Sequence, residues 1–169
     1  MKLAFKQIVA SLIFLQLSVP LISLAQHHHA NGVSVKTSVL AVRAFDETTW
    51  TSLVKQGPRP MAYMFTTSYC STCPEAFEVL NNAVKKNGKK IELAAVMMDV
   101  SGAQALRHAS HFSGVTQLYS FDGFEPAIRQ SVDPQWPNVT PYIVLIDRHG
   151  GLQKIIGPPS SSMLKRWLL

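Results

Sequence analysis

The stretch Tyr69-Cys70-Ser71-Thr72-Cys73-Pro74 holds the only two cysteines of the 169-residue chain. The apolar run over 61–65 comes shortly before it and indicates a buried strand. Apolar residues at three- and four-residue spacing follow it as far as Val84, which predicts a helix that ends before Gly88. The two cysteines are therefore expected between a strand and the first long helix.

This position determines the chemistry expected of the two thiols. The first turn of a helix has unsatisfied N–H groups and the positive end of the helix dipole, and both stabilise a thiolate. Thiols at helix N-termini and in Cys-x-x-Cys motifs have pKa values of roughly 3.5–7.5, against about 8.5 for free cysteine. We expect Cys70 to be the more acidic thiol and to attack a partner. We expect the more buried Cys73 to resolve the mixed disulfide.

Three other interpretations of the cysteine pair are compatible with the sequence. One is a structural disulfide, although a bridge that closes so short a loop restricts the unfolded chain little. Another is a structural zinc site, for which histidines would have to supply the remaining ligands. The third is two unrelated buried thiols. The position between a strand and a helix favours redox or metal-transfer chemistry over all three.

The N-terminal segment has the pattern of a signal peptide. Lys2 and Lys6 precede an apolar core over 8–24, and Ser23-Leu24-Ala25 fits a cleavage site. We expect residues 1–25 to be removed by a cut after Ala25, and an uncleaved membrane anchor is the alternative. The mature protein is then expected to be periplasmic or secreted and free of the membrane. Disulfides persist in these compartments outside the cytosol.

Charge and composition indicate little about partners. The formal net charge of +6 falls to +4 without residues 1–25, and nothing indicates binding to nucleic acid. Residues 26–38 are polar and predict a flexible leader that contains His27-His28-His29. If Gln26 becomes the N-terminus, His28 is its third residue and this end can bind Cu(II) or Ni(II) through nitrogen. A polar tail without a metal is the alternative.

The remainder, residues 39–169, predicts one α/β domain. Strands and helices alternate, which indicates a central mixed β-sheet flanked by helices, with a parallel pair of strands around the helix after the cysteines. Besides the elements named above, we expect a strand starting over 39–42, strands over 91–100, 118–121, 142–146 and 152–156, and helices over 47–55, 102–112, 125–131 and 160–168.

Three features in this order resemble the thioredoxin-like superfamily over residues 39–169. They are the strand, Cys70-Ser71-Thr72-Cys73 and helix; Val139-Thr140-Pro141 before a strand; and a β-hairpin followed by a terminal helix. The likeness is greatest to exported TlpA-type thiol:disulfide oxidoreductases, because the stretch from Thr140 to Gly151 resembles their TPxxxLID…G pattern. The resemblance implies a thioredoxin-like fold with a cis bond before Pro141, packed beside the cysteines.

The motif and the resemblance predict an exported thiol:disulfide oxidoreductase. Its redox-active group would be the Cys70–Cys73 disulfide, with no other cofactor, and it would exchange disulfides with exported proteins and an unidentified redox partner. We expect Tyr69, Thr140 and Pro141 to bind the substrate, because a cis turn can expose the Thr140 backbone to an extended peptide. Ser71-Thr72 departs from the family pattern, so the direction of electron flow does not follow from the sequence.

Two further functions share features with the chain. SCO-type copper chaperones are exported thioredoxin folds with a cysteine pair, and soft thiolates with an imidazole suit Cu(I). Copper ligands would then be Cys70 and Cys73 with His108 or His111, since Thr140-Pro141 occupies the place of the usual histidine. Peroxiredoxins match the chain only at Thr67, three residues before Cys70.

Overall fold

Residues 41–88 and 91–169 are described by the structure, which is a computed structural model. The signal peptide expected over 1–25, the leader over 26–38 and the histidines within that leader all lie outside the described residues. Among the helices of the described ranges, none has the length and apolar character needed to cross a membrane.

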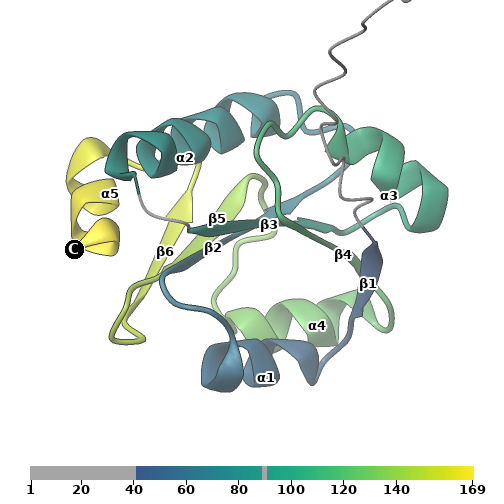
Figure 1. The fold of residues 1–169 in the computed structure, drawn as a ribbon. Coiled ribbons are helices and arrows are strands. Elements are labelled where there is room, and N and C mark those ends of the chain that lie inside the picture. The colour runs from purple at the N-terminus through teal and green to yellow at the C-terminus, as the bar shows by residue number, and fades with distance from the viewer. Residues whose placement is uncertain (1–40, 89–90) are drawn as a thin grey trace, which may run out of the picture. The chain divides into compact units, whose positions relative to one another are not determined.

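Six strands of the described chain form one mixed sheet in the order β1-β4-β3-β2-β5-β6 (Figure 1). The strands β1, β4, β3 and β2 run parallel, whereas β5 pairs antiparallel with both β2 and β6. The central mixed sheet and the parallel pair expected from the sequence are confirmed. The strands are β1 (Val42–Phe45), β2 (Met61–Thr66), β3 (Glu92–Met97), β4 (Gln117–Phe121), β5 (Tyr142–Ile146) and β6 (Leu152–Ile156).

Helices cover both faces of the sheet. In Figure 1, α2, α3 and α5 lie on one face, and α1 and α4 lie on the other. Successive side chains of a strand point to opposite faces, so Met64 joins the cluster under α2 and α5 while Phe65 joins the cluster under α1 and α4. The helices are α1 (Thr49–Gln56), α2 (Cys73–Asn87), α3 (Gly102–Ala109), α4 (Glu125–Val132) and α5 (Ser161–Leu168).

Several element boundaries differ from the sequence expectation: the strand expected over 91–100 is β3, which ends at Met97, and the helix expected over 47–55 is α1, which begins at Thr49. The strand expected to start over 39–42 is β1, which begins at Val42, within that range, and runs to the buried Phe45. The helix expected over 102–112 ends at Ala109, so its last expected turn is not helical. The hydroxyl of Ser110 donates a 2.7 Å hydrogen bond to the carbonyl of Arg107, and such side-chain bonds to the backbone compete with helix continuation.

The carboxylate of Asp46 holds the start of α1. It accepts hydrogen bonds of 2.9 Å from the backbone N–H groups of Thr48 and Thr49, and bonds of 2.8 Å from their hydroxyls. These bonds, with the Thr49 hydroxyl the largest cause, lower the pKa of Asp46 from 3.8 to about 2. Because the folded-state pKa is depressed, this stabilisation is present above pH 3.8 and is lost as the pH falls towards about 2.

We therefore expect Asp46→Ala to lower the midpoint of thermal unfolding at neutral pH. The variant should also lose less stability than the parent protein between pH 3.8 and about pH 2, because it lacks the carboxylate that becomes protonated there. Denaturant unfolding of both proteins across this range measures the difference. An identical loss of stability in the two proteins would contradict the role assigned to Asp46.

Candidate functional site

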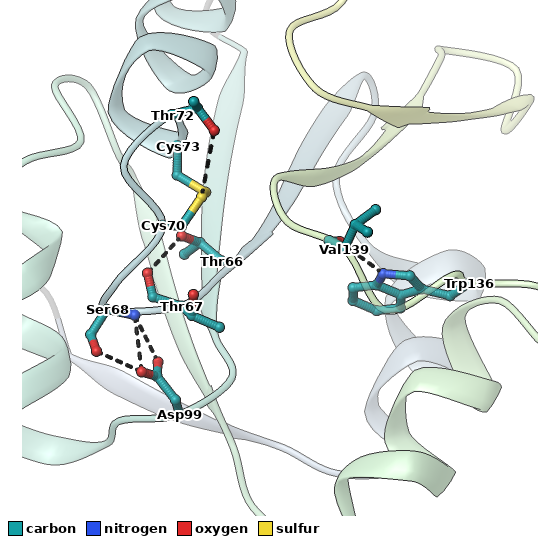
Figure 2. Close-up of a disulfide and its surroundings, with 9 residues drawn as sticks. All are labelled: Thr66, Thr67, Ser68, Cys70, Thr72, Cys73, Asp99, Trp136 and Val139. Atoms are coloured by element: carbon teal, nitrogen blue, oxygen red, sulfur yellow. Dashed lines mark hydrogen bonds between the residues drawn. A yellow bond between two sulfur atoms is a disulfide. The ribbon is translucent and has the colours of Figure 1, made fainter.

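The two cysteines form a disulfide at the start of α2, with Cα atoms 5.5 Å apart (Figure 2). Cys73 is the first residue of α2 and is fully buried, whereas Cys70 lies in the preceding loop and is partly exposed. The expected position of the pair at the first long helix is confirmed, and Cys73 is the more buried cysteine, as expected. A partner can therefore approach Cys70 more easily than Cys73.

The first turn of α2 keeps its capacity to stabilise a negative charge. Thr72 occupies the N-cap position but makes no side-chain hydrogen bond to the N–H groups of that turn. Its hydroxyl instead lies 3.9 Å from the sulfur of Cys70. Pro74 has no N–H group to lose, which suits the first turn of a helix. The positive end of the helix dipole therefore favours a thiolate over a thiol at this helix end.

The loop before Cys70 is anchored to the end of the neighbouring strand β3. The carboxylate of Asp99 accepts hydrogen bonds of 2.9 and 3.0 Å from the N–H of Ser68, and its Oδ2 accepts a 2.6 Å bond from the Ser68 hydroxyl (Figure 2). The N–H of Cys70 donates to the carbonyl of Thr67 at 3.2 Å. Asp99 thus fixes the path of the chain two residues before the exposed cysteine.

Asp99 was not predicted from the sequence as part of the site. The signal for Asp99 in the sequence was its position at the end of an apolar strand that follows the helix after the cysteines. The carboxyl ends of parallel neighbouring strands meet at one edge of a sheet, where functional polar residues gather.

We expect Asp99→Ala to slow disulfide exchange at Cys70 by about fivefold, since a net hydrogen-bond contribution of about 1 kcal/mol is lost at the loop. The measurement is the rate at which the reduced protein attacks a small chromogenic disulfide. Asp122→Ala serves as the matched control, because Asp122 is also exposed and lies in the loop between β4 and α4. Equal rates for Asp99→Ala and the parent protein, or equal losses in both variants, would contradict the anchoring role.

A groove beside the cysteines collects residues from three parts of the chain. Thr67 and Tyr69 come from the cysteine loop, Met98 and Asp99 from the end of β3, and Glu125, Asn138 and Thr140 from α4 and the loop before β5. The structure therefore brings Tyr69 and Thr140, two of the expected substrate-binding residues, to one surface. Pro141 follows Thr140 through a cis peptide bond, as the resemblance implied.

Trp136 contacts both ends of the segment that carries Thr140. The indole N–H of Trp136 donates a 3.1 Å hydrogen bond to the carbonyl of Val139 (Figure 2). The indole ring stacks on Tyr142 with ring centroids 4.3 Å apart. This support from Trp136 was not predicted from the sequence.

The two histidines considered as copper ligands lie side by side, and His111 shares a pocket with Ser71 and Pro74 of the cysteine motif. The ring centroids of His108 and His111 are 5.4 Å apart. Burial, and next the neighbouring His111, lower the pKa of His108, while Asp99 acts in the opposite direction. Within residues 41–88 and 91–169, no three His, Cys, Asp or Glu side chains lie close enough to hold one metal ion. The structure therefore does not join Cys70, Cys73 and either histidine in one ligand set.

No protein-family profile matches the chain, and no curated protein matches it. Among solved structures, it is similar to the thioredoxin-related protein from Neisseria meningitidis serogroup B, with 15% identity over 76% of this chain and 96% of that chain and a TM-score of 0.51. It is also similar to a secreted Mycobacterium tuberculosis disulfide oxidoreductase homologous to E. coli DsbE (14% identity, 65% of this chain, 80% of that chain, TM-score 0.48). Apo Sco1 from Thermus thermophilus matches at 15% identity, 69% of this chain, 79% of that chain and a TM-score of 0.42. The likeness to the Neisseria protein shows that the fold is thioredoxin-like, as the sequence predicted.

Proposed function

We propose that this chain, whose fold is thioredoxin-like, is an exported thiol:disulfide oxidoreductase. The observation that carries the proposal is the Cys70–Cys73 disulfide at the start of α2, with Cys70 partly exposed and Cys73 buried. A disulfide that serves only stability needs no exposed sulfur and gains little from so short a loop. An attacking thiol, by contrast, must be accessible and partly ionised.

The exchange reaction follows from this geometry. In the reduced protein, the Cys70 thiolate attacks one sulfur of a client disulfide, forms a mixed disulfide and releases the other client sulfur as a thiolate. Cys73 then loses its proton and attacks the Cys70 sulfur, which re-forms the Cys70–Cys73 disulfide and releases the second client thiolate. Two electrons pass from the protein to the client, and the reverse sequence oxidises a client dithiol.

The client and the compartment belong to the same proposal. Tyr69, Thr140 and Pro141 would receive an extended client segment at the groove beside the cysteines. Residues 1–25 would direct the chain out of the cytosol, where the pair can persist as a disulfide and exchange with exported proteins. A separate redox partner would restore the starting state of the cysteines.

The test is the reduction of insulin by the protein in the presence of dithiothreitol, together with the reduction potential of the pair against glutathione. We expect catalysis that is lost in Cys70→Ser, and a potential between about −270 and −120 mV, the span from thioredoxin to strong oxidants. Glu78→Gln is the control, because Glu78 is exposed on α2. A potential below about −300 mV without catalysis would indicate a structural disulfide.

A titration of the reduced protein with Cu(I) against a strong chelator tests the alternative, copper delivery. Weak binding is the expected result. Stoichiometric binding that disappears when either cysteine is replaced would overturn the proposal in favour of a metallochaperone, because thiolates suit Cu(I).

A further inference from the structure

Two grooves of opposite charge flank the loop that leads to the cysteines. The groove beside the cysteines that Tyr69 and Thr140 line is here called the Thr140 groove. It contains Asp99 and Glu125 and no basic residue. A second groove, here called the α3 groove, contains Arg107, His108 and His111 and no acidic residue. Its remaining lining residues are Ser68, Val100 and Gln104.

The two grooves meet at the anchored cysteine loop. Ser68 lines the α3 groove, while its neighbours Thr67 and Tyr69 line the Thr140 groove. Asp99 lines the Thr140 groove, and the next residue, Val100, lines the α3 groove. The hydrogen-bonded pair of Ser68 and Asp99 is therefore the ridge between them. A segment whose cysteine reaches Cys70 can extend into both grooves.

The negative charge of the Thr140 groove is available to a ligand. Asp99 is bonded only to the uncharged Ser68, and no described basic side chain forms an ion pair with it. The side chain of Glu125 is 47% exposed and pairs at 3.2 Å with Arg129, which does not line the groove. A cationic side chain that enters this groove therefore meets two carboxylates.

Exposed apolar side chains belong to one residue that lines the same groove and to two that precede lining residues in the sequence. Tyr69 is 80% exposed and lines it, Phe124 is 70% exposed and precedes Glu125, and Val139 is 40% exposed and precedes Thr140. Exposed large apolar side chains close to a polar groove are typical of an interaction surface. The Thr140 groove thus fits a segment that combines apolar and cationic side chains.

The α3 groove has the opposite character. Arg107 is exposed and permanently charged. The Nε2 atom of His108 is buried and has no hydrogen-bond partner among the described residues. An acidic side chain in this groove would pair with Arg107 and can supply a partner for His108.

The backbone of Thr140 is free to bind such a segment. Within the described ranges, neither its N–H nor its carbonyl takes part in a hydrogen bond. An extended peptide can therefore add main-chain hydrogen bonds here, while its side chains occupy the grooves.

We propose that the two grooves select the client by charge: the favoured segment carries cationic and apolar residues on one side of its reacting cysteine and acidic residues on the other. The first side occupies the Thr140 groove and the second occupies the α3 groove. This inference rests on the proposed function, since it names the clients of the same cysteine pair. The covalent steps are those given above.

The experiment uses peptides whose single cysteine is joined to thionitrobenzoate through a disulfide. Cys70 of the reduced protein attacks the cysteine sulfur of the peptide, and the thionitrobenzoate that leaves is measured by its absorbance. Two peptides of identical composition carry Arg and Phe on one side of the cysteine and Glu on the other, in the two possible orders. A third peptide carries Gln in place of every charged residue.

We expect one of the two charge orders to react about tenfold faster than the other, because each exposed ion pair contributes up to a factor of about five. The preference should decrease at high salt, which screens exposed charges. Glu125→Gln and Arg107→Gln should each reduce it by about threefold. The controls Glu78→Gln and Arg148→Gln should leave it unchanged, since neither residue lines either groove.

Equal rates for all three peptides, in a protein that exchanges with each of them, would overturn charge selection and leave the proposed function intact. A preference that persists unchanged in both Glu125→Gln and Arg107→Gln would also overturn it. Failure to react with any peptide, combined with failure to reduce insulin, would overturn the oxidoreductase proposal itself.

Discussion

Replacing Cys73 with serine is expected to produce a protein that attacks a client disulfide once and then stays attached to it. Cys70 remains able to form the mixed disulfide, but the sulfur that would resolve it is missing. Replacing Cys70 is expected to abolish exchange completely, because the remaining sulfur of Cys73 is fully buried. The two variants therefore separate the attacking cysteine from the resolving one.

The measurement is the mass of the protein after incubation with a disulfide-bonded client under non-reducing conditions. Cys73→Ser should gain the mass of the client and lose it again with dithiothreitol, whereas Cys70→Ser should gain nothing. The double variant controls for non-covalent association. Covalent capture by Cys70→Ser, with none by Cys73→Ser, would reverse the assigned roles.

Truncation of Trp167 in α5 is expected to destabilise the fold by about 3–5 kcal/mol, as is typical when a buried tryptophan is replaced by alanine. Trp167 is fully buried, and its indole N–H donates a 3.0 Å hydrogen bond to the carbonyl of Ile146. It belongs to the same buried cluster as Cys73. Its removal leaves a cavity and removes the hydrogen bond to the carbonyl of Ile146.

Equilibrium unfolding in urea measures this loss. Trp167→Phe should lose less stability than Trp167→Ala because it fills part of the cavity. Leu169→Ala is the matched control, since Leu169 is 66% exposed two residues further on and should change stability by no more than about 0.5 kcal/mol. A loss below about 1 kcal/mol for Trp167→Ala would contradict the packing described for α5.

The elements that were predicted well are those with strong local patterns. β2 has six consecutive buried residues, which makes its apolar run easy to recognise. The turn between β5 and β6 is marked by Asp147, whose carboxylate accepts hydrogen bonds of 2.8 and 2.9 Å from the N–H groups of His149 and Gly151. Such turn residues act through neighbours in the sequence, so their effect is visible without the fold.

The elements that were predicted less well have weak or competing patterns. β1 is an edge strand with only Phe45 buried, so apolar residues do not mark where it begins. The end of α3 depends on the side chain of Ser110, which bonds to the backbone instead of allowing another turn. The resulting error extended the expected helix past His111, which lies beyond the last helical residue.

The sequence by itself determined the cysteine pair, its place before α2, and the alternation of strands and helices, because spacing and periodicity act over a few residues. Only the tertiary structure decided what surrounds the pair. Ser68 and Asp99 bond across 31 positions of the chain, and Glu47 accepts a hydrogen bond from Phe124 across 77. A crossover through α2 sets β3 beside β2, and local patterns do not specify which side chains then meet at the sheet edge. The hydrogen bonds that anchor the cysteine loop, and the two charged grooves, depend on which side chains meet at this sheet edge.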